Sequence, residues 1–281
     1  IVPDKRLFHV RPAPQIPARC PRAAAHFLLP ISYTFRAKKS IPCPAPRGRK
    51  KGRKTVAFPA LRVYSVPMKI EQPKYTEPAE ELGYEQLAAR LAEEERICGA
   101  RISGALHGLS PESAAFSGVK FSACSFAETK WRGADFADCV FESCDLSAAD
   151  FSRSSFRRVL FSECKGLGAD FPEGSFADCT FEKCNLSYAN FSAGKLRAVL
   201  LSACDCSHAD LVGCALKNFA AEHTRFFRAN FFGTSLKGVD LTTCGLAGIT
   251  LSAQLAELRG AVLSRWQCAD FLRALGAEIR D

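Results

Sequence analysis

Large apolar residues recur at every fifth position through the middle of the chain. From Phe116 to Leu251 this spacing holds for 28 consecutive units without an insertion or deletion. Only Gly166, Cys206 and Ala221 place a residue at the centre of a unit that is not large and apolar. The residue two before each centre is small or β-branched almost throughout, and the other three positions are mostly polar or small. The pattern therefore marks two inward positions in every five.

Neither regular element supplies a five-residue period. Five residues turn an α-helix by about 500°, so such positions spread around the helix instead of forming one stripe. In a flat strand, an odd step sends successive side chains to opposite faces. The period predicts instead a coil that turns a corner every five residues, with the centre and the residue two before it pointing into a shared core.

The unit resembles the pentapeptide-repeat family, whose signature is Ala, then Asp or Asn, then Leu or Phe, then any two residues. The matching triplets are Ala134-Asp135-Phe136, Ala149-Asp150-Phe151, Ala169-Asp170-Phe171, Ala189-Asn190-Phe191, Ala209-Asp210-Leu211 and Ala229-Asn230-Phe231. The resemblance covers residues 114–253. It implies an all-β solenoid, namely a right-handed, four-sided parallel β-helix with four units per turn, hence about seven coils for 28 units. The similar stretches FADCVFESCDLSAADFS (136–152) and FADCTFEKCNLSYANFS (176–192) would then lie on the same faces, two coils apart.

Stacking at twenty residues sorts the small inward positions into columns of one residue type. The cysteine column reads Cys124, Cys144, Cys164, Cys184, Cys204, Thr224 and Cys244. Stacked Cβ atoms lie about one strand spacing apart, ~4.8 Å, whereas disulfide-bonded Cβ atoms approach to about 3.8 Å. We therefore expect free, buried thiols in a reduced, cytoplasmic protein. We expect no metal and no cofactor, because no histidine lies near these columns.

The segment before the repeats predicts a closure of the first coil. Residues 68–80 are polar and contain proline, so we expect a linker or a loose tail. Residues 81–96 predict a helix, and residues 97–113 predict an irregular first coil because they keep only part of the register. The apolar face of the helix would carry Tyr84, Leu87, Ala88 and Leu91.

The register loosens after Leu251, and residues 254–281 predict a last coil, a capping helix and a tail. Ser264 and Gln267 have the spacing of a capping box, which begins a helix at residue 265, and Gly276 ends it. The apolar stripe of this helix would close the open end of the solenoid. It consists of Cys268, Phe271, Leu272 and Leu275.

Trp266 points away from that stripe, which predicts a homodimer. A large aromatic residue that faces water at the end of a solenoid is typical of a contact surface. We expect Trp266 near the two-fold axis and Ile279 beside it. The alternative is that Trp266 folds back over Leu258 and Leu263 of its own chain.

The first 67 residues differ in composition from the rest. They hold 15 of the 38 Lys and Arg residues but only one of the 29 acidic residues, Asp4, so residues 68–281 carry 23 basic and 28 acidic residues, a net charge of −5. Three interpretations of residues 1–67 stay open. Translation starts at Met68, or the segment is a transit peptide, or it is a basic arm for nucleic acid. The cluster of such an arm would be Arg47, Arg49, Lys50, Lys51, Arg53 and Lys54.

No pattern in the sequence is typical of a catalytic site. The chain has no phosphate-binding loop, no serine-nucleophile motif and no HExxH motif. A column of acidic and amide side chains could form a carboxylate row, but such residues usually cap backbone turns. Its members are Asp150, Asp170, Asn190, Asp210 and Asn230. We therefore expect that the protein is not an enzyme.

Solenoids present extended surfaces for binding, so we expect a non-enzymatic interaction or scaffold protein whose protein partner the sequence does not name. The resemblance implies an alternative. Some pentapeptide-repeat proteins protect type II topoisomerases such as gyrase from quinolones by imitating duplex DNA with an acidic surface. The net negative charge of residues 68–281 is compatible with that activity.

Two sets of outward charges are the candidates for a contact surface. The acidic set is Glu142, Glu163, Glu182 and Glu222, and the basic set on another face is Arg157, Arg197, Lys217 and Lys237. A surface that is acidic on one side and basic on another fits a simple DNA mimic poorly. Direct binding to nucleic acid through the basic set is a less favoured alternative than topoisomerase binding, and no membrane contact is expected.

Two of the units with small centres, Gly166 and Cys206, fall on the same face of the predicted solenoid with Leu186 between them. Each lacks most of the volume of a leucine side chain. We expect a local cavity, or a neighbour such as Leu167 that turns inward to fill it.

Overall fold

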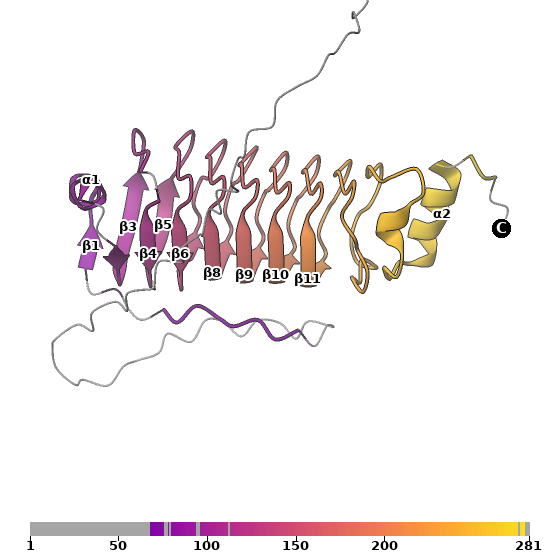
Figure 1. Cartoon of the computed structure of the whole chain (residues 1–281), viewed down its shortest axis with the longest axis horizontal. Helices are drawn as coiled ribbons and strands as arrows, with labels where there is room; N and C mark the ends of the chain where they lie inside the picture. Colours follow the sequence, from indigo (N-terminus) through magenta and orange to yellow (C-terminus); the bar gives the residue numbers. More distant parts are fainter. Residues whose placement is uncertain are drawn as a thin grey trace, which may run out of the picture. The chain divides into compact units, whose positions relative to one another are not determined.

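The five-residue period becomes a stack of parallel strands (Figure 1). The computed structural model describes residues 68–75, 78, 80–93, 96–111, 113–274 and 276–278. The interpretations of residues 1–67, and Ile279, lie outside the described residues. The strands are β1 (Glu80–Leu82), β2 (Ile97–Cys98), β3 (Ala100–Ala105), β4 (Ala115–Ser117), β5 (Lys120–Ser125), β6 (Asp135–Ala137), β7 (Val140–Glu142), β8 (Ser155–Ser162), β9 (Ser175–Glu182), β10 (Lys195–Ser202) and β11 (Ala215–Glu222). The helices are α1 (Tyr84–Ala92), the 3₁₀ turn η1 (Ala256–Leu258) and α2 (Arg265–Ala274).

Each unit turns its corner at the residue two after its centre. The φ angle is positive at Asp138 (56°), Ser143 (53°), Ala148 (52°) and Arg153 (58°), which gives four corners in one coil. From β6 onwards, paired strands of neighbouring coils align twenty residues apart, and every pairing is parallel. The fold is therefore a four-sided parallel β-solenoid of about seven turns, which confirms the architecture that the repeat predicts.

The core consists of the central residues stacked coil upon coil. The rings of Phe136 and Phe156 are 5.1 Å apart and nearly parallel, and those of Phe161 and Phe181 are 4.4 Å apart. Rings from neighbouring sides of one coil meet edge to face, as Phe136 and Phe141 do. These side chains are fully or almost fully buried. The interior of the repeat region is thus filled by aromatic and aliphatic side chains.

The N-terminal end is more regular than the sequence predicts. β1 occupies the start of the predicted helix and pairs with β3 in parallel, so the solenoid gains a strand there. Helix α1 begins only at Tyr84, whose side chain is exposed although the sequence places it on the apolar face, while Leu87 is fully buried. The first coil pairs with the next at an offset of nineteen residues, as in Ile97 with Phe116, and a bulge at Ser103/Gly104 restores the offset of twenty.

Residues 68–75 are not a loose tail. Two of their backbone N–H groups donate to carboxylates of the solenoid, from Lys74 to Asp138 and from Glu71 to Asp178. In Figure 1 this indigo segment runs along the stack of coils instead of along any one strand. The expectation of a free linker is therefore wrong for this part of the chain.

At the C-terminal end the capping box and the stop of the helix are confirmed. Ser264 N–H donates to Gln267 Oε1 at 2.7 Å, and Gln267 N–H donates to Ser264 Oγ at 3.3 Å. Gly276, with φ of 85°, donates to the Arg273 carbonyl. Gln267 Nε2 also donates to the carbonyl oxygens of Leu241 and Cys244, at 2.7 and 2.8 Å, so it caps the last coil.

The predicted apolar stripe of α2 is largely wrong. Phe271 packs against the core, but Cys268 and Leu272 are exposed and Leu275 lies outside the described residues. Polar side chains contribute much of the contact that closes the C-terminal end of the solenoid instead. Besides Gln267, the buried Glu257 of η1 accepts hydrogen bonds from the N–H of Gly233 and from the N–H and hydroxyl of Ser252.

The corner at Gly166 is filled by a different neighbour from the one expected. Leu167 remains exposed. A Cβ atom added at Gly166 would lie 3.0 Å from Leu186 Cδ2, because Leu186 of the next coil leans over the missing side chain. Little unfilled space is therefore left at this corner.

Candidate interaction surface

The acidic candidates do not form one continuous column. Glu142 and Glu182 occupy the same outward position two coils apart, with Ser162 between them. Glu222 continues this column, but its side chain is buried. Glu163 lies in the neighbouring corner column, since it is one residue beyond Ser162. The four carboxylates therefore do not present one acidic strip.

The basic candidates are placed more regularly. Arg157, Arg197 and Lys217 occupy one outward position of β8, β10 and β11, and Ala177 fills that position in β9. Lys237 follows twenty residues later, and all four basic side chains are exposed. Arg197 also lies 3.6 Å from Asp178 Oδ2. The set is thus a partly paired row of cations.

Ion pairs between neighbouring coils neutralise much of the outer charge. In several of them an acidic residue of one coil contacts a basic residue twenty positions later. These pairs are Asp138–Arg158, Asp145–Lys165, Glu163–Lys183 and Asp205–Arg225. Lys120 binds Glu142 at 2.7 Å, and Arg132 binds Asp150 at 2.5 Å. The outer surface is therefore a mosaic of paired charges, not an acidic face.

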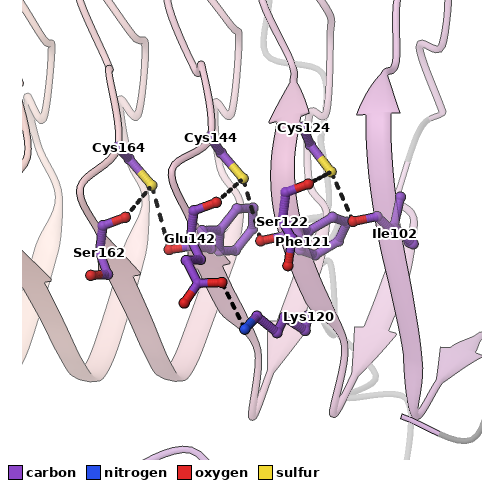
Figure 2. Close-up of polar contacts among 10 residues, drawn as sticks. Ile102, Lys120, Phe121, Ser122, Cys124, Glu142, Cys144, Ser162 and Cys164 are labelled. Carbon is purple, nitrogen blue, oxygen red and sulfur yellow. Dashed lines mark hydrogen bonds and ion pairs between the residues drawn. The ribbon is translucent and has the colours of Figure 1, made fainter. Parts of the chain in front are cut away.

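The cysteine column is built into the backbone of the solenoid (Figure 2). Five thiols of the column each lie within hydrogen-bonding distance of two carbonyl oxygens, one two residues earlier and one on the coil before, namely those of Cys124, Cys144, Cys164, Cys184 and Cys204. Cys144 Sγ, for example, is 3.5 Å from the Glu142 oxygen and 3.4 Å from the Phe121 oxygen. Eleven of the described cysteines are free. Cys98 of β2 is disulfide-bonded, so the expectation of a fully reduced chain does not hold at that position.

Two buried thiols outside this column, Cys139 and Cys179, are poor nucleophiles. Burial raises the pKa of the Cys139 and Cys179 thiols to about 12, so both are protonated at neutral pH. Within the described residues, no three His, Cys, Asp or Glu side chains converge as metal ligands would. The hydrogen bonds from its thiols to backbone carbonyls indicate that the cysteine column supports the stacked coils.

The Asp and Asn column caps the corners, as its residue types suggest. Asp150 and Asn190 each accept the N–H of the serine two residues later, at 3.0 Å. Asn190 Nδ2 also donates to Asp170 Oδ1 of the coil before, at 3.2 Å. These oxygens therefore stabilise the corners and the stacking of neighbouring coils.

An exposed group of aromatic residues lies on a corner of the solenoid and was not predicted. The rings of Tyr188 and His208 are stacked 4.7 Å apart, and Phe227 meets His208 edge to face at 5.7 Å. The guanidinium of Arg228 lies 5.1 Å from the centre of the Phe227 ring. Tyr188 is 59% exposed and Phe227 is also exposed. We call these four residues the aromatic patch.

The sequence did carry a signal for this patch. Tyr188 stands two residues after its unit's centre and Phe227 one residue after its own, where most units have a small or charged residue. Aromatic residues at such outward positions do not serve the core. The pattern of charges does not reveal them, because neither of these two aromatic rings is charged.

The C-terminal end exposes a second apolar surface. Trp266 is 76% exposed, and Val262 and Leu272 are exposed as well. Leu258 and Leu263 pack against the core without covering Trp266, so the alternative in which it folds back over them is wrong. No described helix is long and apolar enough to cross a membrane.

Comparison with known proteins agrees with this architecture. A model of the pentapeptide repeat region matches residues 114–176 and 174–251. No curated protein matches the chain. Among solved structures, the chain is similar to QnrB1, a plasmid-mediated fluoroquinolone resistance protein, with 22% identity over 72% of this chain and 97% of that chain and a TM-score of 0.42.

Two further structures are more distant. HetL, involved in heterocyst differentiation regulation in the cyanobacterium Nostoc, is 19% identical over 65% of this chain and 97% of its own, with a TM-score of 0.26. A pentapeptide repeat protein of the Arabidopsis thaliana thylakoid lumen is 18% identical over 46% of this chain and 84% of its own, with a TM-score of 0.17. At such identities the likeness concerns the fold alone. Through residues 114–251, the chain belongs to the pentapeptide-repeat family.

Proposed function

We propose that the protein is a non-enzymatic scaffold that binds a protein partner through the aromatic patch. The observation that carries this proposal is that Tyr188 and Phe227 are both exposed and are joined into one group by their ring contacts with His208. Exposed apolar groups that are not scattered singly mark interaction sites. Tyrosine and arginine are also among the residues that dominate binding energy at protein interfaces.

The patch has the features of a preorganised contact. Stacking on His208 fixes the ring of Tyr188, and Phe227 is held between His208 and Arg228. Side chains already fixed in the free protein lose little conformational entropy on binding. A partner with an apolar pocket rimmed by acidic groups would complement Tyr188, Phe227 and the cation of Arg228.

Catalysis is a poorer account of the same residues. An active site needs converging reactive groups in a pocket that excludes water. Here the described polar side chains that are most buried support the backbone, as Glu257 does at the last coil and Thr224 at the Leu201 and Glu222 carbonyls. The filled core leaves the outer surface as the place for function.

Affinity enrichment from an extract of the natural source tests the proposal. The wild type, a Tyr188→Ser/Phe227→Ser variant and a Lys183→Ala control would be compared at equal loading. We expect a protein that co-purifies with the wild type and the control at constant stoichiometry and is lost with the double variant. The proposal would be contradicted if the same proteins co-purified with all three chains.

A second candidate function is binding to a type II topoisomerase by DNA mimicry. The net charge of −5 in residues 68–281 favours it. The ion pairs between coils weigh against it, because a DNA mimic needs unpaired carboxylates along the contact side. A titration of gyrase supercoiling with the full chain decides. We expect no inhibition and no quinolone protection up to high micromolar protein, and a dose-dependent effect would favour the mimic.

A further inference from the structure

A segment of this chain is bound along the outer face of its own solenoid. The N–H of Lys74 donates to Asp138 Oδ1 at 2.9 Å, and the N–H of Glu71 donates to Asp178 Oδ1 at 3.4 Å. Asp138 and Asp178 hold the same corner position, two coils apart. Residues 68–75 therefore cross the strands and follow the stack of coils, as Figure 1 shows. We call these residues the strap.

The face that carries Asp138 and Asp178 also has apolar side chains that do not belong to the core. Along β6 and β7, Ala137 and Val140 alternate with inward residues, so both point outward on either side of the Asp138 corner, yet both are buried. Thr180, at the position of Val140 two coils later, is buried too. Pro73 and Tyr75 of the strap are themselves buried. Backbone hydrogen bonds to the strap and buried outward-pointing apolar side chains thus occur on the same face.

An extended chain fits this face because the distance between alternate coils nearly equals the length of three extended residues. Two coils of a parallel stack span about 9.6 Å. Three residues of a polyproline-type chain span about 9.3 Å. Donors three residues apart, such as Glu71 and Lys74, therefore meet acceptors two coils apart with almost no mismatch. The match depends on the backbone, so a segment of another sequence can satisfy it.

The acceptors are positioned by the solenoid itself. Arg158 Nη2 binds Asp138 Oδ2 at 2.6 Å, and Arg197 lies 3.6 Å from Asp178 Oδ2. Both carboxylates are thus paired with cations that belong to the solenoid. The pKa of Arg158 is raised, chiefly by its hydrogen bond to Asp138 and to a smaller extent by the charge of Glu71. The face thus favours an acidic residue at the position of Glu71.

We propose that this face is a binding surface for extended, proline-containing protein segments, and that the strap occupies it in cis until a partner's segment displaces it. The pattern that it recognises is Glu-x-Pro-x-Tyr, as in Glu71 to Tyr75. This inference deepens the proposed binding function by naming a class of bound segment. It uses a different surface from the aromatic patch, so the two proposals fail separately.

A peptide-binding experiment on the full chain tests the proposal. In a Glu71→Pro/Lys74→Pro variant the strap loses both donors, because proline has no N–H, while the face is unchanged. A fluorescent peptide with the sequence of residues 68–75 is titrated against this variant and the wild type. We expect at least about tenfold tighter binding to the variant, since the strap no longer competes. A Gln72→Pro variant, which keeps both donors, should behave as the wild type.

A peptide with proline at the positions of both Glu71 and Lys74 should not bind. The proposal is overturned if the double variant keeps a native circular dichroism spectrum but does not bind, or if all chains bind the peptide equally. Should the double variant not fold, hydrogen exchange of the wild type decides. Faster exchange of the Glu71 and Lys74 amides than of the Val140 amide supports a displaceable strap, and exchange at the rate of global unfolding overturns it.

Discussion

Arg158 holds Asp138 of the preceding coil through two hydrogen bonds of 2.6 Å, from Nε and from Nη2. The two side chains are only 18% and 15% exposed, so solvent screens this pair less than the other pairs between coils. The same carboxylate also accepts the N–H of Lys74. One corner thus links the stacking of the coils to the docking of the strap.

Replacing this arginine should therefore cost more than replacing an exposed partner. We expect Arg158→Ala to lower the free energy of unfolding by about 1.5–3 kcal/mol, because Asp138 keeps its burial and loses charged hydrogen bonds. Lys183→Ala is the matched control, since its pair with Glu163 is 59% and 56% exposed. It should cost about 0–1 kcal/mol. Equal losses in urea titrations would contradict this account of the corner.

Glu257 should make the C-terminal coil sensitive to acid. Burial opposes its ionisation, but the N–H of Gly233 and the N–H and hydroxyl of Ser252 outweigh it and lower the pKa from 4.5 to about 2. A folded-state pKa below the ordinary value means that the ionised group stabilises the fold above pH 4.5 and that this contribution is lost as the pH falls towards 2.

The comparison with Glu257→Gln measures this effect. At neutral pH we expect the variant to be less stable by about 1–3 kcal/mol, because the amide leaves one buried donor without an acceptor. The difference in urea midpoint between wild type and variant should shrink as the pH falls from 4.5 to 2. A difference that is constant across this range would show that ionisation of Glu257 is not involved.

Gly166→Leu should destabilise the solenoid instead of filling a cavity. Leu186 already covers the site, with Cδ2 at 3.0 Å from an added Cβ. Overpacking of this kind costs about 1–3 kcal/mol. The φ angle of Gly166 is not positive, so backbone strain does not explain a loss. A Leu186→Ala change in the same chain should recover part of the loss. Thermal unfolding of the wild type, the two single variants and the double variant gives the coupling free energy between the two positions.

The exposed C-terminal surface is expected to form a homodimer. Trp266, Leu272 and Val262 supply apolar area at the end of the solenoid. Sedimentation at tens of micromolar should show a dimer for the wild type and a monomer for Trp266→Ala/Leu272→Ser. Ile279, which we also placed at this interface, lies outside the described residues. A monomeric wild type would contradict the dimer, and a dimer that survives the double change would place the contact elsewhere.

The repeat itself was predictable because its cause is local. Each unit carries its own inward pair, and a positive φ two residues after each centre sets the same corner again and again, as at Asp138 and Ser143. The capping box of α2 was predictable for the same reason, since Ser264 and Gln267 are three residues apart. Such features need no knowledge of distant parts of the chain.

The features that sequence reasoning missed depend on distant partners. The strap has no apolar period, and its place is set by Asp138 and Asp178, more than sixty positions further along the chain. Tyr188 and Phe227 meet only through His208, which the stacking of coils brings between them. The pairing of the outer charges likewise follows from register, so counting charges over residues 68–281 suggested a more acidic surface than the structure has.

The central claim is that the aromatic patch binds a protein partner. Once a co-purifying protein is identified, calorimetric titration of that protein against the full chain tests the claim most directly. We predict that Tyr188→Ser/Phe227→Ser weakens binding by about tenfold or more, equivalent to about 1.4 kcal/mol, and that Lys183→Ala leaves the affinity unchanged. Equal affinities for the wild type and the double variant would show that the partner does not use this patch.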